Sequence, residues 1–168
     1  MRNNSKMINI RILGKDKSLS DSICSSVERY GDMLCKRKNI FISSVSENFE
    51  EIPNNSIVIF CSNFKNKICG KNYLAVFSSE NHHAIEALNG SGNIAISCGM
   101  SAKDTLSAAS ITDEKRMVSL QRTIRSIDGE IIEPRDFYIK SSHGFYASLA
   151  ASAVLLLLGI MPEYGFEI

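Results

Sequence analysis

The feature that most constrains the fold is residues 56–61 (SIVIFC), which would be apolar on both faces of a β-strand. A strand of this kind suits the centre of a parallel sheet, where other layers cover both faces. Further strand-like runs lie on both sides of it in the chain, at residues 7–13, 39–45, 73–77 and 93–98. The sequence therefore predicts an α/β fold with a three-layer, Rossmann-like, mostly parallel sheet.

Two segments between these runs have the apolar spacing of helices. We expect the first helix to begin at Ser18 or Ser20 and to end at Gly31, which suits a helix C-terminus. The second helix is short, and we expect Ser79 to cap it and Asn89-Gly90 to end it. Strand, turn and amphipathic helix in this order are typical of the opening of a Rossmann-like layer.

Towards the C-terminus the pattern changes to alternating extended segments. Residues 116–127 and 130–139 flank Asp128-Gly129, which predicts a two-residue type I′ turn, because that turn needs positive φ at both positions. An apolar helix follows from about Ser142. We therefore expect a C-terminal β-hairpin and a buried last helix, all within a single domain of residues 1–168.

Composition and charge argue against several classes of partner. The 168 residues are 44% hydrophobic and 22% charged, as in an ordinary globular protein. The net charge is +1, from 19 basic and 18 acidic residues, so no global field attracts nucleic acid or an acidic membrane. Short basic clusters at residues 36–38 and 65–71 lie beside predicted strands, where we expect solvated surface. We therefore expect no nucleic-acid partner.

The cysteines indicate the compartment. Cys24, Cys35, Cys61, Cys69 and Cys98 are odd in number and widely spaced, and none forms a CxxC pair or matches a zinc module. Residues 1–6 lack the apolar centre of a secretory signal. These features predict reduced, structural cysteines in a cytoplasmic protein without a metal site.

Residues 145–161 carry no charge, and their length is near the lower limit for crossing a hydrocarbon core of about 30 Å. Ser148 and Ser152 within the segment, and Gly159 and Pro162 at its end, suit a helix buried against a sheet better. We therefore expect no membrane partner.

The turn at residues 14–18 (GKDKS) lies where a phosphate loop would lie, between the first strand and the first helix. A phosphate loop needs two glycines around four residues, followed by Lys and Ser or Thr. This turn has one glycine, and Asp16 would repel a phosphate, so a plain capped turn is favoured. Gly14, Lys15 and Ser18 remain weak candidates for binding a ligand through the exposed donors of the helix N-terminus.

Other polar residues give weaker signals. His82 and His83 would point about 100° apart on a helix and cannot share a metal, so a surface pair of His82 with Glu86 is favoured. His143 precedes the last helix, where it either caps the helix or faces a ligand. Cys98-Gly99 ends a predicted strand, and the carboxyl ends of parallel strands face the ligand crevice. Nothing in the sequence brings a histidine to Cys98.

The order of motifs in the second half of the chain resembles the central, ATP-binding domain of the Mur ligase family. YLAVFSSEN at residues 73–81 resembles an apolar strand followed by Asn-x-Asp-Asp, and NIAISCG at 93–99 resembles the next strand. KDTLSAASI at 103–111 sits where the family has an Ala-Asp segment before a hairpin. SHGFYASLAA at 142–151, with LGI at 158–160, sits at the family's His-Asn-x-x-Asn-x-x-Ala-Ala and Leu-Gly-Ile. The resemblance includes neither the N-terminal nor the C-terminal domain of the family.

The groups that the family uses on ATP are changed at the matching positions. Gly144 stands for the first of the two asparagines, Ser79 and Glu80 stand for the paired aspartates, and the phosphate loop is absent. Residues 63–72 leave no room for the family's metal and lysine positions. Because nothing would hold the transferred phosphoryl group or its metal, the resemblance implies a fold and a ligand crevice without a cofactor, and not a ligase.

Three interpretations of function remain open at this point. The first is a non-catalytic Mur-ligase-like domain that binds a protein partner or a small ligand. The second is an enzyme of another kind that uses the crevice near Gly14, Cys98-Gly99 and His143. The third is a subunit of a larger assembly, with residues 154–158 partly at an interface, and a homo-oligomer belongs to this third group.

Overall fold

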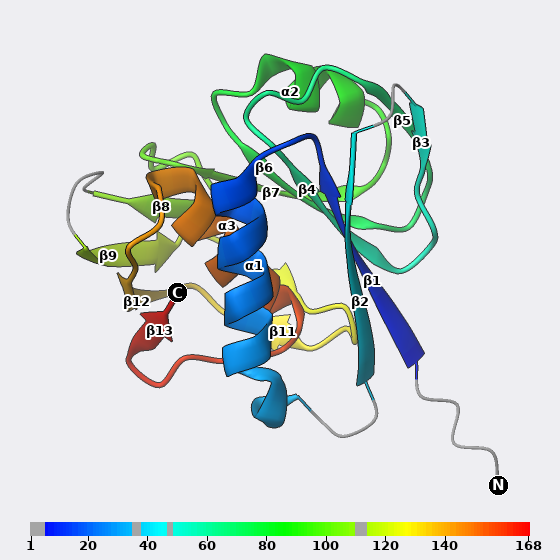
Figure 1. The fold of residues 1–168 in the computed structure, drawn as a ribbon. Helices are drawn as coiled ribbons and strands as arrows, with labels where there is room; N and C mark the ends of the chain where they lie inside the picture. Colours follow the sequence, from blue (N-terminus) through cyan, green and yellow to red (C-terminus); the bar gives the residue numbers. More distant parts are fainter. Residues whose placement is uncertain (1–5, 35–37, 47–48, 110–113) are drawn as a thin grey trace, which may run out of the picture.

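A nine-stranded sheet organises the computed structural model, which describes residues 6–34, 38–46, 49–109 and 114–168 (Figure 1). Its strands are β1 (Lys6–Leu13), β2 (Lys38–Val45), β4 (Ser56–Phe60), β6 (Leu74–Ser78), β7 (Ile94–Gly99), β8 (Leu106–Ala108), β9 (Lys115–Leu120), β12 (Arg135–Lys140) and β13 (Gly165–Glu167). Their order across the sheet is β13-β12-β9-β8-β7-β6-β4-β1-β2.

The strands from β2 to β8 in this order run parallel to one another, and β9 is antiparallel to both β8 and β12. β13 returns parallel to β12 at the far edge. All five residues of β4 are buried, as expected for a central strand that is covered on both faces. The predicted α/β, Rossmann-like, mostly parallel sheet is confirmed.

Helices α1 (Lys17–Arg29) and α3 (Phe145–Leu157) lie together over one face of the sheet (Figure 1). Small residues let the two helices approach closely. The Ser22 hydroxyl of α1 donates a 3.2 Å hydrogen bond to the Ala147 carbonyl of α3, and the Ser26 hydroxyl donates to the Ser22 carbonyl. The apolar side of α1, with Leu19 and Ile23, joins the main core beneath.

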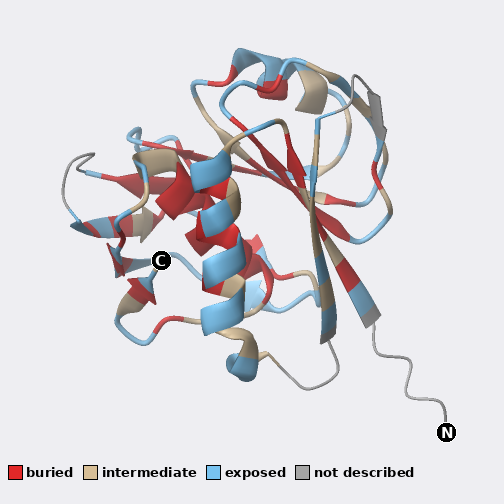
Figure 2. Cartoon of the chain, in the orientation of Figure 1, coloured by how far each residue is buried: buried red, intermediate tan, exposed pale blue. Residues whose placement is uncertain are grey.

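The last helix is buried, as predicted, and Figure 2 shows it at the centre of the molecule. It begins at Phe145 rather than Ser142 because the preceding turn is closed by side chains, with the His143 N–H donating to the Ser141 hydroxyl. Residues 154–158 are at most 1% exposed within the chain's own core, so the interpretation of this run as an interface is wrong. In the described part of the chain, no helix is both long enough and apolar enough to cross a membrane.

The opposite face of the sheet is covered by a second, smaller layer. Helix α2 (His82–Leu88) and the short parallel pair β3 (Phe49–Glu51) and β5 (Lys67–Cys69) lie there, in contact with a separate apolar cluster. This cluster contains residues of β1, β4 and β6 but none of β9 or β12. The second layer therefore covers only part of the sheet.

The helix caps differ from the predicted ones. Asp16, not Ser18 or Ser20, caps α1, and its carboxylate accepts the Leu19 N–H at 3.0 Å. Asn81, not Ser79, caps α2 through its side-chain oxygen. Helices α1 and α2 therefore each follow an Asp or Asn residue with extended backbone, which is the usual geometry of an N-cap.

The C-terminal hairpin is confirmed, with β9 and β12 extended by β10 (Ile124–Arg125) and β11 (Ile131–Ile132). Its turn, however, is not type I′. Gly129 alone of the turn has positive φ, at 87°, and its N–H donates to the Ser126 carbonyl, while the Ser126 N–H donates to the Glu130 carbonyl. This is the three-residue loop in which a single glycine takes the left-handed position, so Asp128 is spared that conformation.

Candidate ligand site at the strand ends

The carboxyl ends of β4, β6 and β7 meet the start of α3. Parallel α/β folds bind their ligands at this end of the strands. A pocket of about 350 Å³ opens there. Its walls are formed by Ser62, Ser78, Glu80, Asn81, Gly99, Met100, Phe145 and Tyr146. Each comes from a strand end, from the loop after it, or from α3.

Tyr146 forms the wall that α3 contributes. Its hydroxyl donates a 2.6 Å hydrogen bond to the Phe60 carbonyl of β4 and lies 3.4 Å from the Val76 carbonyl of β6. Burial raises the pKa of the phenol well above its ordinary value, and the nearby thiols of Cys98 and Cys61 raise it further. Tyr146 is therefore a neutral, fixed part of the wall and not a base.

Asn81 connects two elements of the pocket wall. Its side-chain NH₂ group donates a 2.9 Å hydrogen bond to the Cys61 carbonyl, while its oxygen caps α2. The residue is 6% exposed, so these bonds satisfy both ends of a buried amide. Asn81 thus fixes the position of α2 relative to the end of β4, and it shapes the pocket.

Gly99 lies where β7 passes closest to the neighbouring loop. A Cβ at this position would collide with the Asp104 carboxylate and with the Ser79 hydroxyl. Asp104 is 3% exposed and accepts the Ser101 N–H at 3.0 Å, so it cannot easily move away. The pocket wall at Gly99 therefore depends on a buried carboxylate that sequence reasoning did not identify.

The turn between β1 and α1, where the sequence favours a plain capped turn over a phosphate loop, is tightly packed. Gly14 has φ +108°, and a Cβ there would lie 2.9 Å from the Cβ of Cys61 and 3.0 Å from Oδ1 of Asn63. The Asn63 NH₂ group donates to the Lys15 carbonyl at 3.1 Å. The Asp16 carboxylate already accepts an N–H of the first turn of α1. Gly14 therefore sits in a tight turn.

The two thiols near the strand ends are buried. Burial raises the pKa of Cys61 to about 12, with Asp16 adding to the effect. Burial also raises the pKa of Cys98, with Asp104 adding to it. Because the thiolate is the reactive form, neither cysteine is activated as a nucleophile in this arrangement.

Of the remaining predicted site residues, Gly99 alone lines the pocket. Gly99 is in its wall, and Cys98 is buried beside it in β7. Lys15 and Ser18 are exposed at the start of α1, outside the set of lining residues. His143 is half-buried two residues before Phe145, and its carbonyl accepts a hydrogen bond from the Ser148 hydroxyl.

His82 and His83 are exposed on α2. Among the described residues, no group of three or more His, Cys, Asp or Glu side chains is arranged to hold a metal ion. Sequence reasoning missed the roles of Asn81 and Tyr146 in the wall. An asparagine three residues before Ala84 is an N-cap signal that could have identified Asn81.

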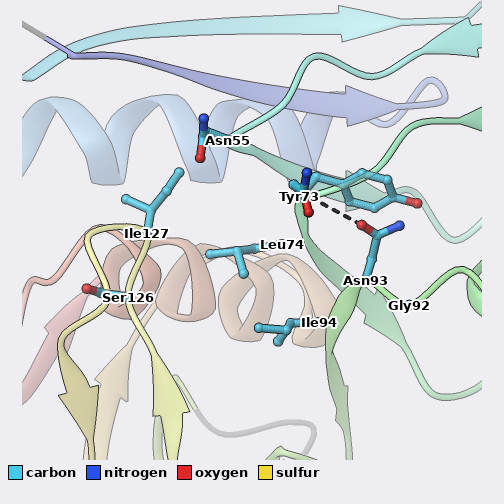
Figure 3. A pocket seen from close by; sticks show the side chains of 9 residues that line it. Asn55, Tyr73, Leu74, Gly92, Asn93, Ile94, Ser126 and Ile127 are labelled. Atoms are coloured by element: carbon cyan, nitrogen blue, oxygen red, sulfur yellow. Dashed lines mark hydrogen bonds between the residues drawn. The ribbon is translucent and has the colours of Figure 1, made fainter.

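A second pocket, of about 240 Å³, opens at the other end of the parallel strands, beside their amino ends and the hairpin (Figure 3). It is lined by Asn55, Asn72, Tyr73, Leu74, Gly92, Asn93, Ile94, Ser126 and Ile127. The Asn93 side-chain oxygen accepts the Tyr73 N–H at 3.3 Å. The pocket at the carboxyl ends is larger and lies where α/β folds bind ligands, so it is the stronger candidate.

Comparison with protein-family models and with curated proteins gave no match for this chain.

Proposed function

We propose that this chain is a non-catalytic, Mur-ligase-like domain that binds a small ligand in the pocket at the carboxyl ends of β4, β6 and β7. The observation that carries the proposal is the Asp16 cap. A carboxylate that belongs to the chain occupies the helix N-terminus where a nucleotide phosphate would need free donors. Asp16 is not among the residues that line the pocket.

The pocket's chemistry narrows the class of ligand. Glu80 is the charged residue among the eight that line it, and the lining contains no Lys, Arg or His. Phe145 and Met100 supply apolar surface, and Met100 is 52% exposed at the rim. These walls favour a neutral or cationic molecule with an apolar part, such as a small amine, over a nucleotide or another phosphate.

The enzyme interpretation receives less support. It needs an activated nucleophile or base, while the buried Cys98 thiol has a raised pKa and the half-buried Tyr146 phenol donates its proton to the Phe60 carbonyl in a hydrogen bond. A binding role needs only the pocket.

A thermal-shift screen tests the proposal. The purified protein is heated with ATP and Mg²⁺, and separately with a set of small amines and neutral polar compounds. A ligand at 100 times its dissociation constant stabilises the folded state by about 2.7 kcal/mol, which shifts the midpoint by several degrees. We expect no shift with ATP and Mg²⁺ and a shift with at least one amine or neutral compound.

Two variants make the screen specific to the pocket. Ser62→Trp places a large ring at the pocket wall and should abolish the shift, whereas Ser25→Trp on the exposed side of α1 should leave it intact. Hydrolysis of ATP by the purified protein, or a clear shift with ATP and Mg²⁺, would overturn the proposal. So would a ligand shift that survives Ser62→Trp.

A further inference from the structure

The two edges of the sheet are built very differently. The β13 edge is a strand of three residues, and its Glu167 forms a 2.9 Å ion pair with Arg29 of α1. The β2 edge is a strand of eight residues whose positions 39–45 (NIFISSV) contain no charge, no proline and no glycine. Short strands and charges are the usual protection of an edge against pairing with another chain. β13 has this protection, and β2 lacks it after its first residue.

The outer edge of β2 has no strand partner among the described residues, since β2 is the terminal strand of the sheet and pairs with β1. Phe41 at its middle is 53% exposed. Asn9 of β1 pairs with Phe41, and Met7 lies two residues before Asn9 and therefore on the same face of the sheet. Met7 is 59% exposed. Residues 40–45 therefore lie on an edge that no second strand covers in the described part of the chain, next to large exposed apolar side chains.

The sequence of this edge is nearly symmetric about Phe41. Ile40 and Ile42 flank it, and Asn39 and Ser43 lie one step further out. If two copies of β2 pair antiparallel about a two-fold axis at Phe41, then Phe41 faces Phe41, Ile40 faces Ile42, and Asn39 faces Ser43. Directly opposed residues in such a pair lie on the same face, about 4.5–5.5 Å apart between Cβ atoms. Like side chains therefore meet on both faces.

We propose that two copies of this chain associate through β2, as an antiparallel, two-fold pair centred on Phe41 that joins their sheets into one continuous sheet. A second copy fits this edge because an isologous interface must be complementary to itself, which a near-symmetric apolar strand is. Ile40 and Ile42 already pack against the main core of their own chain, so their outer sides would extend that core into the partner. The proposal does not depend on the proposed ligand.

Sedimentation velocity over a wide range of protein concentration tests the association. We expect a dimer for the native chain and a monomer for Phe41→Lys, because two like charges would then be opposed at the axis. The matched control is Ile131→Lys, which places the same charge at a residue that is 56% exposed on the hairpin. It should remain a dimer. A native chain that is monomeric throughout, or a dimer that withstands Phe41→Lys, would overturn the proposal.

Disulfide trapping tests the register in a background where Cys24, Cys35 and Cys69 are changed to Ser. With diamide as the oxidant, Phe41→Cys should cross-link two copies. Ser43→Cys alone should not, because its two copies would lie roughly 14 Å apart along the strands. A mixture of Asn39→Cys and Ser43→Cys chains should cross-link again. Cross-linking through Ser43→Cys alone, or none through Phe41→Cys, would contradict the pairing.

Discussion

The Tyr146 hydroxyl donates a 2.6 Å hydrogen bond to the Phe60 carbonyl, and this bond attaches the first turn of α3 to the end of the central strand. The bond spans 86 positions of the chain, so it links elements that form far apart in the sequence. It also fixes a wall of the candidate pocket. Loss of this bond should therefore change both the stability of the protein and the shape of the pocket.

Tyr146→Phe should lower the free energy of unfolding by about 1–2 kcal/mol, since it removes the donor to a buried carbonyl. Tyr138→Phe is the control, because Tyr138 is 42% exposed on β12 and should change stability by less than about 0.5 kcal/mol. Urea unfolding followed by circular dichroism measures both. Equal effects of the two substitutions would mean that the Tyr146 bond contributes nothing specific.

Gly99→Ala should destabilise the protein by about 1–3 kcal/mol, since the new methyl group would collide with Asp104 and Ser79. Gly31→Ala is the matched control, because no atom lies within 4 Å of a Cβ at that position. The same unfolding experiment distinguishes them. If the two variants are equally stable, the tight packing of Asp104 against β7 is not present in solution.

Asp16→Ala should lower stability by about 1 kcal/mol because it removes the cap of α1, whereas Asp16→Asn keeps an acceptor and should lose much less. Ser18→Ala tests the competing sequence-based assignment and should be nearly neutral. Thermal unfolding of the three variants separates these expectations. A larger loss for Ser18→Ala than for Asp16→Ala would assign the cap to Ser18 instead.

Alkylation of the native protein should modify Cys24 and Cys69, which are exposed, long before Cys61 and Cys98, which are buried. The raised pKa of Cys61, about 12, adds to this protection because it keeps the thiol protonated. Iodoacetamide treatment at pH 8 followed by peptide mass spectrometry gives the order. In denaturant these thiols should all react at similar rates, which controls for local sequence effects.

Stability should fall as the pH rises above about 9. The pKa of Cys61 is raised from 9.0 to about 12 in the folded state, so the unfolded chain loses this proton first. The stabilisation is fully present below pH 9 and is lost as the pH approaches 12. Burial also raises the pKa of Cys98 in the folded state, so this thiol adds to the loss of stability at high pH. Urea unfolding at pH 8 and pH 10.5 measures the fall, and Cys61→Ala should reduce its size. A stability that stays constant over this range would contradict the burial of both thiols.

Strongly patterned segments could be predicted from the sequence, and segments held by distant contacts could not. β4 follows from its apolar residues and α1 from its helical spacing, because burial alone decides both. β3, β5 and β13 have three residues each, and their pairing depends on partners far along the chain. Short strands of this kind leave no periodic signal.

The candidate site was predicted in the same uneven way. Gly99 was recognised because it ends an apolar strand, which is a local property. The buried Asp104 beside it, and the attachment of Tyr146 to Phe60, depend on which loops the fold brings together. The turn at Asp128-Gly129 shows a different limit. The same two residues suit two loop lengths, and the hydrogen bonds between Ser126 and Glu130 and between Gly129 and Ser126 are those of the longer loop.

The connection from β1 to α1 has a consequence for engineering. It contains only Gly14, Lys15 and Asp16, with Asn63 and Cys61 packed against it. A phosphate-binding loop needs a longer connection, so no single substitution could create one here. An insertion would have to be combined with replacement of the Asp16 cap and of the side chains that press on Gly14. A designer who wants a nucleotide-driven version of this scaffold should therefore transplant the whole connection in one step.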